Sequence, residues 1–171
     1  MRLFIKNKIF TLSGSSFVLD EKGNKVFKVK GKWGLFSPTH KKKIIDKDGN
    51  LRYIVRNKFW RFISTSCFLY DDSKQKIAML TNNDFDIRSR YVLKGYQDEI
   101  VIKGNFSEFP KFTMDIEKNG KNIGKITRDF TIIRDSFVLD IFDDTEDAFL
   151  VALVIAIDNI ADDRRSRNNR N

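Results

Sequence analysis

Residues 145–161 read TEDAFLVALVIAIDNIA, and this stretch decides the fold of the chain. All ten residues from Ala148 to Ile157 are hydrophobic, and they stand between Asp147 and Asp158. A helix that is apolar on every side must be buried on every side, either in a protein core or in a membrane. At 1.5 Å per residue the run is roughly 15 Å long, about half of the ~30 Å hydrocarbon core of a bilayer. The stretch therefore predicts a buried core helix and no transmembrane segment.

Charged residues mark both ends of this helix. Glu146 and Asp147 suit the positive end of the helix dipole, and Arg164 and Arg165 follow its negative end. The residues from 162 to 171 are polar and offer no apolar side chain that could anchor them. We therefore expect a single domain over residues 1–161, followed by a disordered tail over residues 162–171.

The residues before the helix alternate between short apolar runs and turn residues, which is typical of β-structure. Three units share one design, in which a strand ends in an acidic residue, a turn with Gly follows, and a second strand returns. The paired runs are FVLD (17–20) with KVFKVK (25–30), KIID (43–46) with LRYIVR (51–56), and FTMDIE (112–117) with KNIGKIT (121–127). Looser copies occupy residues 67–80 and 91–104. A series of hairpins that curves into a sheet would supply apolar side chains to the helix from every direction.

The net charge of the chain is distributed unevenly along its 171 residues. The formal net charge is +9. Residues 1–61 contain sixteen Lys and Arg and four Asp and Glu, whereas residues 62–171 contain sixteen Lys and Arg and nineteen Asp and Glu. A basic segment of this kind predicts an anionic partner, such as a lipid surface, a nucleic acid or an acidic protein. The alternative is a solvated face that only keeps the protein soluble.

The sequence offers little for catalysis or metal binding. His40 is a single histidine and Cys67 a single cysteine, so sites with two histidines and internal disulfides are excluded. We interpret Cys67 as a core thiol in a reducing compartment, since it lies in an alternating strand pattern. The Gly-x-Ser-x-Gly, HExxH and P-loop motifs are absent. We therefore expect a protein that is not an enzyme and that needs no cofactor or metal.

The acidic groups of the sequence have a structural explanation. The pairs at 46 and 48 and at 71 and 72 stand at turns, and the acids at 143–147 stand before the helix. Oxygen ligands of this kind can bind Ca²⁺, but the segment at 46–49 has its Gly too early for an EF-hand loop. We interpret these acids as turn and cap residues.

Basic residues that alternate with aromatic residues form the candidate binding site. Lys28, Lys30 and Lys32 lie along one strand before Trp33, and further cations flank the pair at 59–60. Such a mixture suits a lipid headgroup layer or a nucleic-acid backbone. The alternative is that the lysines form the solvent side of an amphipathic strand. The candidate residues for an anionic ligand are Lys28, Lys30, Lys32, Lys41, Lys42, Lys43, Arg56, Lys58 and Arg61.

The order of these pieces resembles that of the LURP-one-related proteins in the tubby C-terminal-domain-like superfamily. The resemblance is carried by FVLDEKGNKVFKVKGK at 17–32, IIDKDGN at 44–50, IKGNF at 102–106, IGKIT at 123–127, and DSFVLDI and DDTEDAFLVALVIAID from 135 to 158. It covers nearly the whole chain. It implies a mainly β fold, a closed antiparallel barrel of roughly twelve strands around a central hydrophobic C-terminal helix.

The resemblance also implies a function. Tubby-like relatives bind phosphoinositide headgroups through basic side chains, although their binding residues do not align with particular positions here. It therefore implies a non-enzymatic binding module, cytoplasmic or peripheral at the membrane, for anionic lipid headgroups or a protein partner. The alternatives are a lipid-handling protein related to phospholipid scramblases, although no calcium site carries over, and a nucleic-acid binder.

Overall fold

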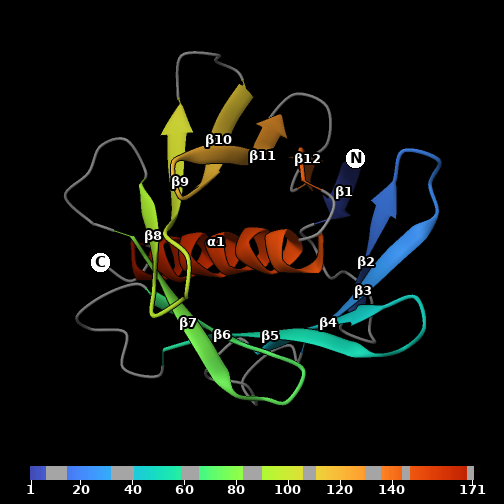
Figure 1. The fold of residues 1–171 in the computed structure, drawn as a ribbon. Coiled ribbons are helices and arrows are strands. Elements are labelled where there is room, and N and C mark those ends of the chain that lie inside the picture. Colours follow the sequence, from blue (N-terminus) through green and yellow to red (C-terminus); the bar gives the residue numbers. More distant parts are fainter. Residues whose placement is uncertain are drawn as a thin grey trace.

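A closed barrel of antiparallel strands surrounds one long helix (Figure 1). The computed structural model describes residues 1–6, 15–31, 41–58, 66–82, 90–105, 111–129, 136–143 and 147–168. In these residues the strands are β1 (Arg2–Lys6), β2 (Ser15–Asp20), β3 (Lys25–Gly31), β4 (Lys42–Asp46), β5 (Leu51–Asn57), β6 (Ser66–Tyr70), β7 (Lys76–Asn82), β8 (Tyr91–Lys94), β9 (Ile100–Asn105), β10 (Lys111–Lys118), β11 (Lys121–Asp129) and β12 (Ser136–Ile141). The helix is α1 (Asp147–Asn168).

Each strand pairs with the strands before and after it in the sequence, and β1 closes the barrel by pairing with both β2 and β12. Because side chains alternate across a strand, one set points inwards and the other outwards. In β12, for example, Phe137, Leu139 and Ile141 are buried, while the residues between them are partly exposed. The predicted mainly β, closed antiparallel barrel around a hydrophobic helix is confirmed.

The helix fills the barrel, as its sequence predicted. Every residue from Ala148 to Ile160 is buried, and Leu150 is fully inaccessible to solvent. Within the described part of the chain, α1 lacks the combination of length and hydrophobicity that a membrane-spanning helix requires. Its apolar side chains therefore supply the core of the barrel.

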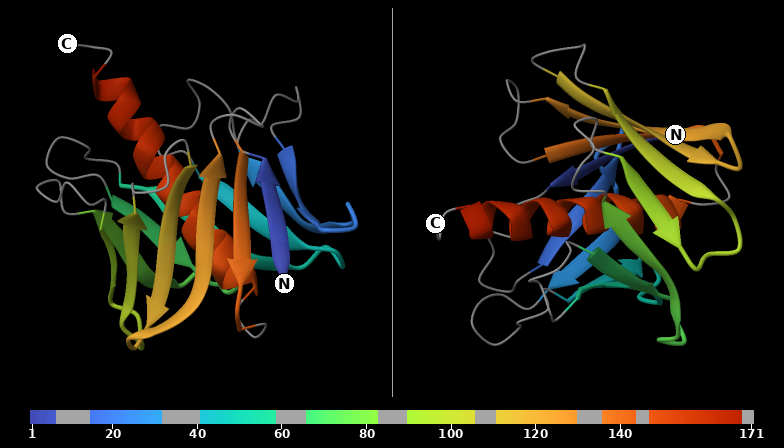
Figure 2. Two further views of the ribbon diagram at one scale, coloured as in Figure 1. Left: turned by 90° about the horizontal axis from the view of Figure 1, so that it is seen from above. Right: turned by 90° about the vertical axis from the view of Figure 1, so that its left-hand side faces the viewer.

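The two ends of the barrel differ in how the strands are joined. At one end, which we call the turn end, short turns join β2 to β3, β4 to β5, β6 to β7, β8 to β9 and β10 to β11. At the other end the strands are joined by longer connections of the sequence. The helix begins at the turn end, where the ring of Phe149 stacks on that of Tyr96 at 4.8 Å between centroids. Its C-terminal part leaves through the opposite end, which we call the helix-exit end, and projects beyond the strands (Figure 2).

The repeated acidic residue of the hairpins organises the turns. The Asp20 carboxylate accepts hydrogen bonds from the backbone N–H groups of Lys22 and Asn24, and the Asn24 side-chain amide also donates to it, at 2.8 Å. The hydrogen bond from the Asn24 side chain is the largest cause that lowers the pKa of Asp20. Gly23 has a φ of 81°, which favours glycine. The motif Asp-x-x-Gly-Asn therefore encodes one turn geometry.

The same geometry recurs in two further turns. Asp46 accepts hydrogen bonds from the backbone N–H groups of Asp48 and Asn50, and Asp71 accepts one from Gln75. In the third turn Lys74 takes the place of the glycine and has a φ of 64°. The looser copy in the sequence is therefore a true copy in structure, with a lysine in a strained position.

The helix ends later than the sequence indicated. It was expected over 145–161 with a disordered tail after it, whereas α1 continues to Asn168. The reason is local, because residues 162–168 contain no Gly or Pro, and Asp163 precedes Arg167 by four residues. An acid four residues before a base supports a helix, and cations suit its C-terminal end. The helix therefore extends seven residues beyond its expected end at 161.

Replacing Leu150 by Ala should lower the free energy of unfolding by about 2–5 kcal/mol, because a buried leucine is lost and a cavity remains. The control is Phe142→Ala, since Phe142 is 59% exposed, and it should change stability by no more than about 0.5 kcal/mol. Urea denaturation of both variants checks this. Equal, small effects would contradict a central helix.

Replacing Lys74 by Gly should raise the free energy of unfolding by about 1 kcal/mol, because a side chain is removed from a left-handed backbone conformation. Gly49 has a φ of 88° in the equivalent turn, with no atom within 4 Å of an added Cβ. Gly49→Ala should therefore destabilise by about 1 kcal/mol through the backbone alone. Thermal unfolding of both variants tests the pair, and shifts in the same direction would contradict the shared turn geometry.

Candidate anion-binding surface

Neighbouring strands bring candidate cations together on the outside of the barrel. Lys30 of β3 lies directly opposite Lys43 of β4, and Lys28 precedes Lys30 by two residues on the same face of β3. Their inward-facing neighbours Phe27 and Val29 are buried in the core. Strand alternation therefore turns all three lysines outwards.

Two further candidates continue this surface towards β5. Arg56 is exposed and lies opposite Phe68 of β6. Since Lys42 is opposite Val55, the next position along each strand places exposed Lys41 beside Arg56. We call the surface formed by Lys28, Lys30, Lys41, Lys43 and Arg56 the basic face.

Three lysines of the basic face lack acidic neighbours. Lys28, Lys30 and Lys43 form no ion pair with any other residue that the structure describes. Like charges directly opposite each other on paired strands are destabilising, and this applies to Lys30 and Lys43. Lys28 has an aromatic neighbour, with its Nζ 5.7 Å from the centroid of the Phe17 ring. Within the basic face, these three lysines therefore carry positive charge that no carboxylate among the described residues compensates.

Cations on other strands of the barrel are arranged differently. Lys103 of β9 is paired with Glu117 of β10 at 2.6 Å, and Arg2 of β1 is paired with Asp140 of β12 at 2.6 Å. These cations are neutralised by carboxylates on the neighbouring strands. On β3 and β4, by contrast, Lys28, Lys30 and Lys43 have no carboxylate partner among the described residues.

The remaining candidates do not join the basic face. Lys58 is half-buried directly after β5, and its backbone N–H donates to the carbonyl of Ser66. Lys32 and Arg61 lie outside the described residues, as do the aromatic residues at 33, 59 and 60 and the histidine at 40.

Lys42 lies inside the barrel, although the sequence grouped it with Lys41 and Lys43. Its Nζ is 3.2 Å from Oδ2 of Asp158 on α1, and the two side chains are only 13% and 4% exposed. Lys42 turns inwards because it alternates with its two outward-facing neighbours along the strand. It therefore ties β4 to the helix and is not part of the basic face.

A small polar cluster surrounds this ion pair at the helix-exit end. The Asn57 side-chain amide donates to the backbone carbonyl of Asn159 at 3.4 Å, and the Cys67 thiol donates to Oδ1 of Asn57 at 2.9 Å. The sequence interpretation missed the cluster because it treated Asp158 only as the charged boundary of the apolar run and Lys42 as part of a surface patch. The buried Ile160 was the available signal, since an apolar residue after Asp158 indicates that the helix is still inside the core.

The acidic residues of the turns accept hydrogen bonds from the turn backbone. The turn function predicted for the acids at 46 and 71 is confirmed by the hydrogen bonds that their carboxylates accept. Among the residues that the structure describes, no three His, Cys, Asp or Glu side chains are grouped as metal ligands would be. Cys67 is fully buried, as expected for a core thiol.

Replacing Lys42 by Met should lower the free energy of unfolding by about 3–5 kcal/mol, because the buried Asp158 loses its cation. Replacing the adjacent Lys43 by Met should change it by no more than about 0.5 kcal/mol. Chemical denaturation of the two variants gives a matched comparison, since the substitution is the same and only the face differs. Similar losses in both would contradict the inward orientation of Lys42.

The comparison with known proteins identifies the family of the chain. No curated protein and no solved structure matches it. The family model described as LURP-one-related matches residues 1–158, a range that spans all the strands described above and most of the helix. The barrel fold is consistent with the link between this family and tubby-like proteins. The chain belongs to the LURP-one-related family.

Proposed function

We propose that this protein is a non-enzymatic, cytoplasmic binding module that docks on anionic membrane surfaces through the basic face. The observation that supports this most directly is the opposed pair Lys30 and Lys43, with Lys28 beside it. All three side chains point outwards without a carboxylate partner among the described residues. An anionic ligand would relieve their mutual repulsion.

Each cation of the basic face would add to the affinity for an anionic membrane. A basic residue close to an anionic membrane contributes about 1 kcal/mol, so the three lysines together contribute about 3 kcal/mol. Membrane surfaces present many anionic headgroups at once, and a set of cations on one face of the barrel can reach several of them together. Screening over ~8 Å at physiological ionic strength makes such binding sensitive to salt.

Lipid is favoured over nucleic acid by the residues next to the basic face in the sequence. A tryptophan at 33 follows β3, and a phenylalanine and a tryptophan at 59–60 follow β5. Tryptophan is enriched where proteins meet the headgroup layer. Aromatic residues can also stack on bases of single strands, so competition between the two ligands is part of the test.

The triple variant Lys28→Gln, Lys30→Gln, Lys43→Gln should bind anionic vesicles about 100-fold more weakly than the wild type, because about 3 kcal/mol of electrostatic attraction is lost. Co-sedimentation with phosphatidylcholine vesicles, with and without phosphatidylserine and at low and high salt, measures the effect. The matched control is Lys22→Gln, Lys47→Gln, Lys121→Gln, which removes the same charge from exposed positions at the turn end.

Four results would count against the proposal. Wild-type protein that does not bind, or binding that ignores both salt and the three substitutions, would make the basic face a solvated surface. Displacement from vesicles by single-stranded nucleic acid that binds more tightly would favour the nucleic-acid alternative. Chemical change of the lipid, detected by mass spectrometry after incubation, would contradict a non-enzymatic function.

A further inference from the structure

We propose that the protein meets the membrane end-on, with the helix-exit end towards the lipid, and that the last turns of α1 provide a second cationic contact. This inference rests on the proposed function and adds an orientation to it. The second contact would be made by Arg164, Arg165 and Arg167. They lie in the part of α1 that projects from the barrel (Figure 2).

The position of the helix relative to the basic face is fixed by buried contacts. Lys42 holds Asp158 at 3.2 Å, and Asn57 donates to the carbonyl of Asn159. Lys42 stands between Lys41 and Lys43 of the basic face, so the helix is held directly behind that face. The projecting part of α1 therefore leaves the barrel next to the basic face.

The distance between the two cationic groups suits a shared surface. The three arginines follow Asp158 by six, seven and nine residues, which is roughly 9–14 Å along the helix axis. Most of the basic face also lies near the helix-exit end. Lys30, Lys43 and Arg56 each stand one residue from the end of their strand on that side. A membrane across the helix-exit end could therefore contact both groups at once.

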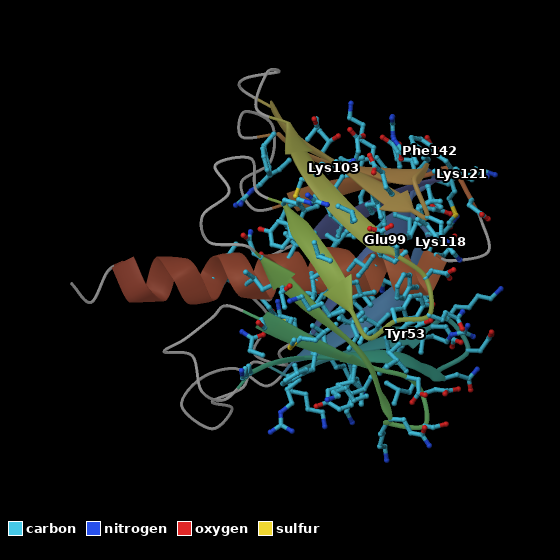
Figure 3. All side chains as sticks on the ribbon, turned by 60° about the vertical axis from the view of Figure 1, so that its left-hand side comes forward. Tyr53, Glu99, Lys103, Lys118, Lys121 and Phe142 are labelled. Atoms are coloured by element: carbon cyan, nitrogen blue, oxygen red, sulfur yellow. The ribbon has the colours of Figure 1, made fainter. Side chains whose placement is uncertain are left out.

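The charges at the turn end favour the same orientation. The segments 20–24, 46–50, 71–75, 95–99 and 118–121 together hold eight Asp and Glu against five Lys. Residues 164–168 hold three Arg and no acid, although two Asp precede them at 162 and 163. An anionic surface would repel the turn end and attract the helix-exit end. Figure 3 shows Lys121 and Phe142 at the end of the molecule opposite the projecting helix.

A structural alternative exists for the arginines. Cations at a helix C-terminus interact favourably with the helix dipole, and this effect alone could account for their presence. That alternative and the proposal differ in one respect. A purely structural function would change the stability of the helix end and leave membrane binding unaffected.

The triple variant Arg164→Gln, Arg165→Gln, Arg167→Gln should bind phosphatidylserine-containing vesicles at least about 10-fold more weakly than the wild type, since each cation near the surface contributes roughly a 5-fold factor. The turn-end control, Lys22→Gln, Lys47→Gln, Lys121→Gln, should stay within about 2-fold, because its charges lie far beyond the screening length from the lipid. Circular dichroism of both variants monitors the helix.

A second measurement reports the orientation without removing any arginine. A fluorophore is attached to Ser166→Cys at the projecting helix or to Lys47→Cys at the turn end, since the native Cys67 is fully buried and does not compete for the label. On vesicle binding, the probe at 166 should become protected from a water-soluble quencher, while the probe at 47 stays accessible. Protection at 47, or equal protection at both positions, would overturn the end-on orientation.

The outcomes separate this inference from the proposed function. If wild-type protein does not bind anionic vesicles, both are overturned. If binding is lost in the basic-face variant but unchanged in the arginine variant, only the second contact is wrong. If binding is weakened by the arginine variant and by the basic-face variant, and the probe at 166 alone is protected, both are supported.

Discussion

The burial of an apolar helix on all sides is the constraint on which the rest of this structure depends. A single sheet covers one side of a helix and a sandwich covers two, so among arrangements of β-strands a closed barrel is the one that covers the whole of α1. Closure is achieved by β1, which pairs with β2 on one edge and β12 on the other. The last strand in the sequence then delivers the chain to the turn end, and from there the helix can enter the barrel that the preceding strands form.

The depth of the helix in the barrel is held by packing contacts, such as the stacking of Phe149 on Tyr96, and by the polar cluster at the helix-exit end. Lys42 and Asp158 can be buried only together, and the Asn57 amide needs the carbonyl of Asn159. Sliding the helix by one turn would leave a buried charge without a partner. The ion pair thus marks the point at which α1 leaves the core and begins to project from the barrel. This point lies directly behind the basic face.

The parts of the structure that depend on local chemistry could be predicted from the sequence. The helix was evident from its uninterrupted apolar run, and the turns were evident from Asp-x-x-Gly-Asn, since backbone geometry restricts the residues there. Closure of the barrel came from the resemblance to a family, because pairing of β1 with β12 leaves no local pattern. The orientation of Lys42 was missed although a local pattern was present. Three consecutive lysines were read as one surface patch, whereas alternation along β4 places the middle one on the same face as the buried Ile44.

The distribution of ion pairs indicates where stability and binding are in conflict. On the strands β9 to β12 a cation such as Lys103 stands opposite a carboxylate, which is the arrangement that stabilises a sheet. On β3 and β4 the sheet instead places Lys30 opposite Lys43, an arrangement that costs stability. Solubility does not require this, because the same lysines could alternate with acids across the strands. In the free protein the lysines repel each other, which raises its free energy. A ligand with negative charge would attract all of them, which would lower the free energy of the complex. This is why we propose that this face binds the anionic partner.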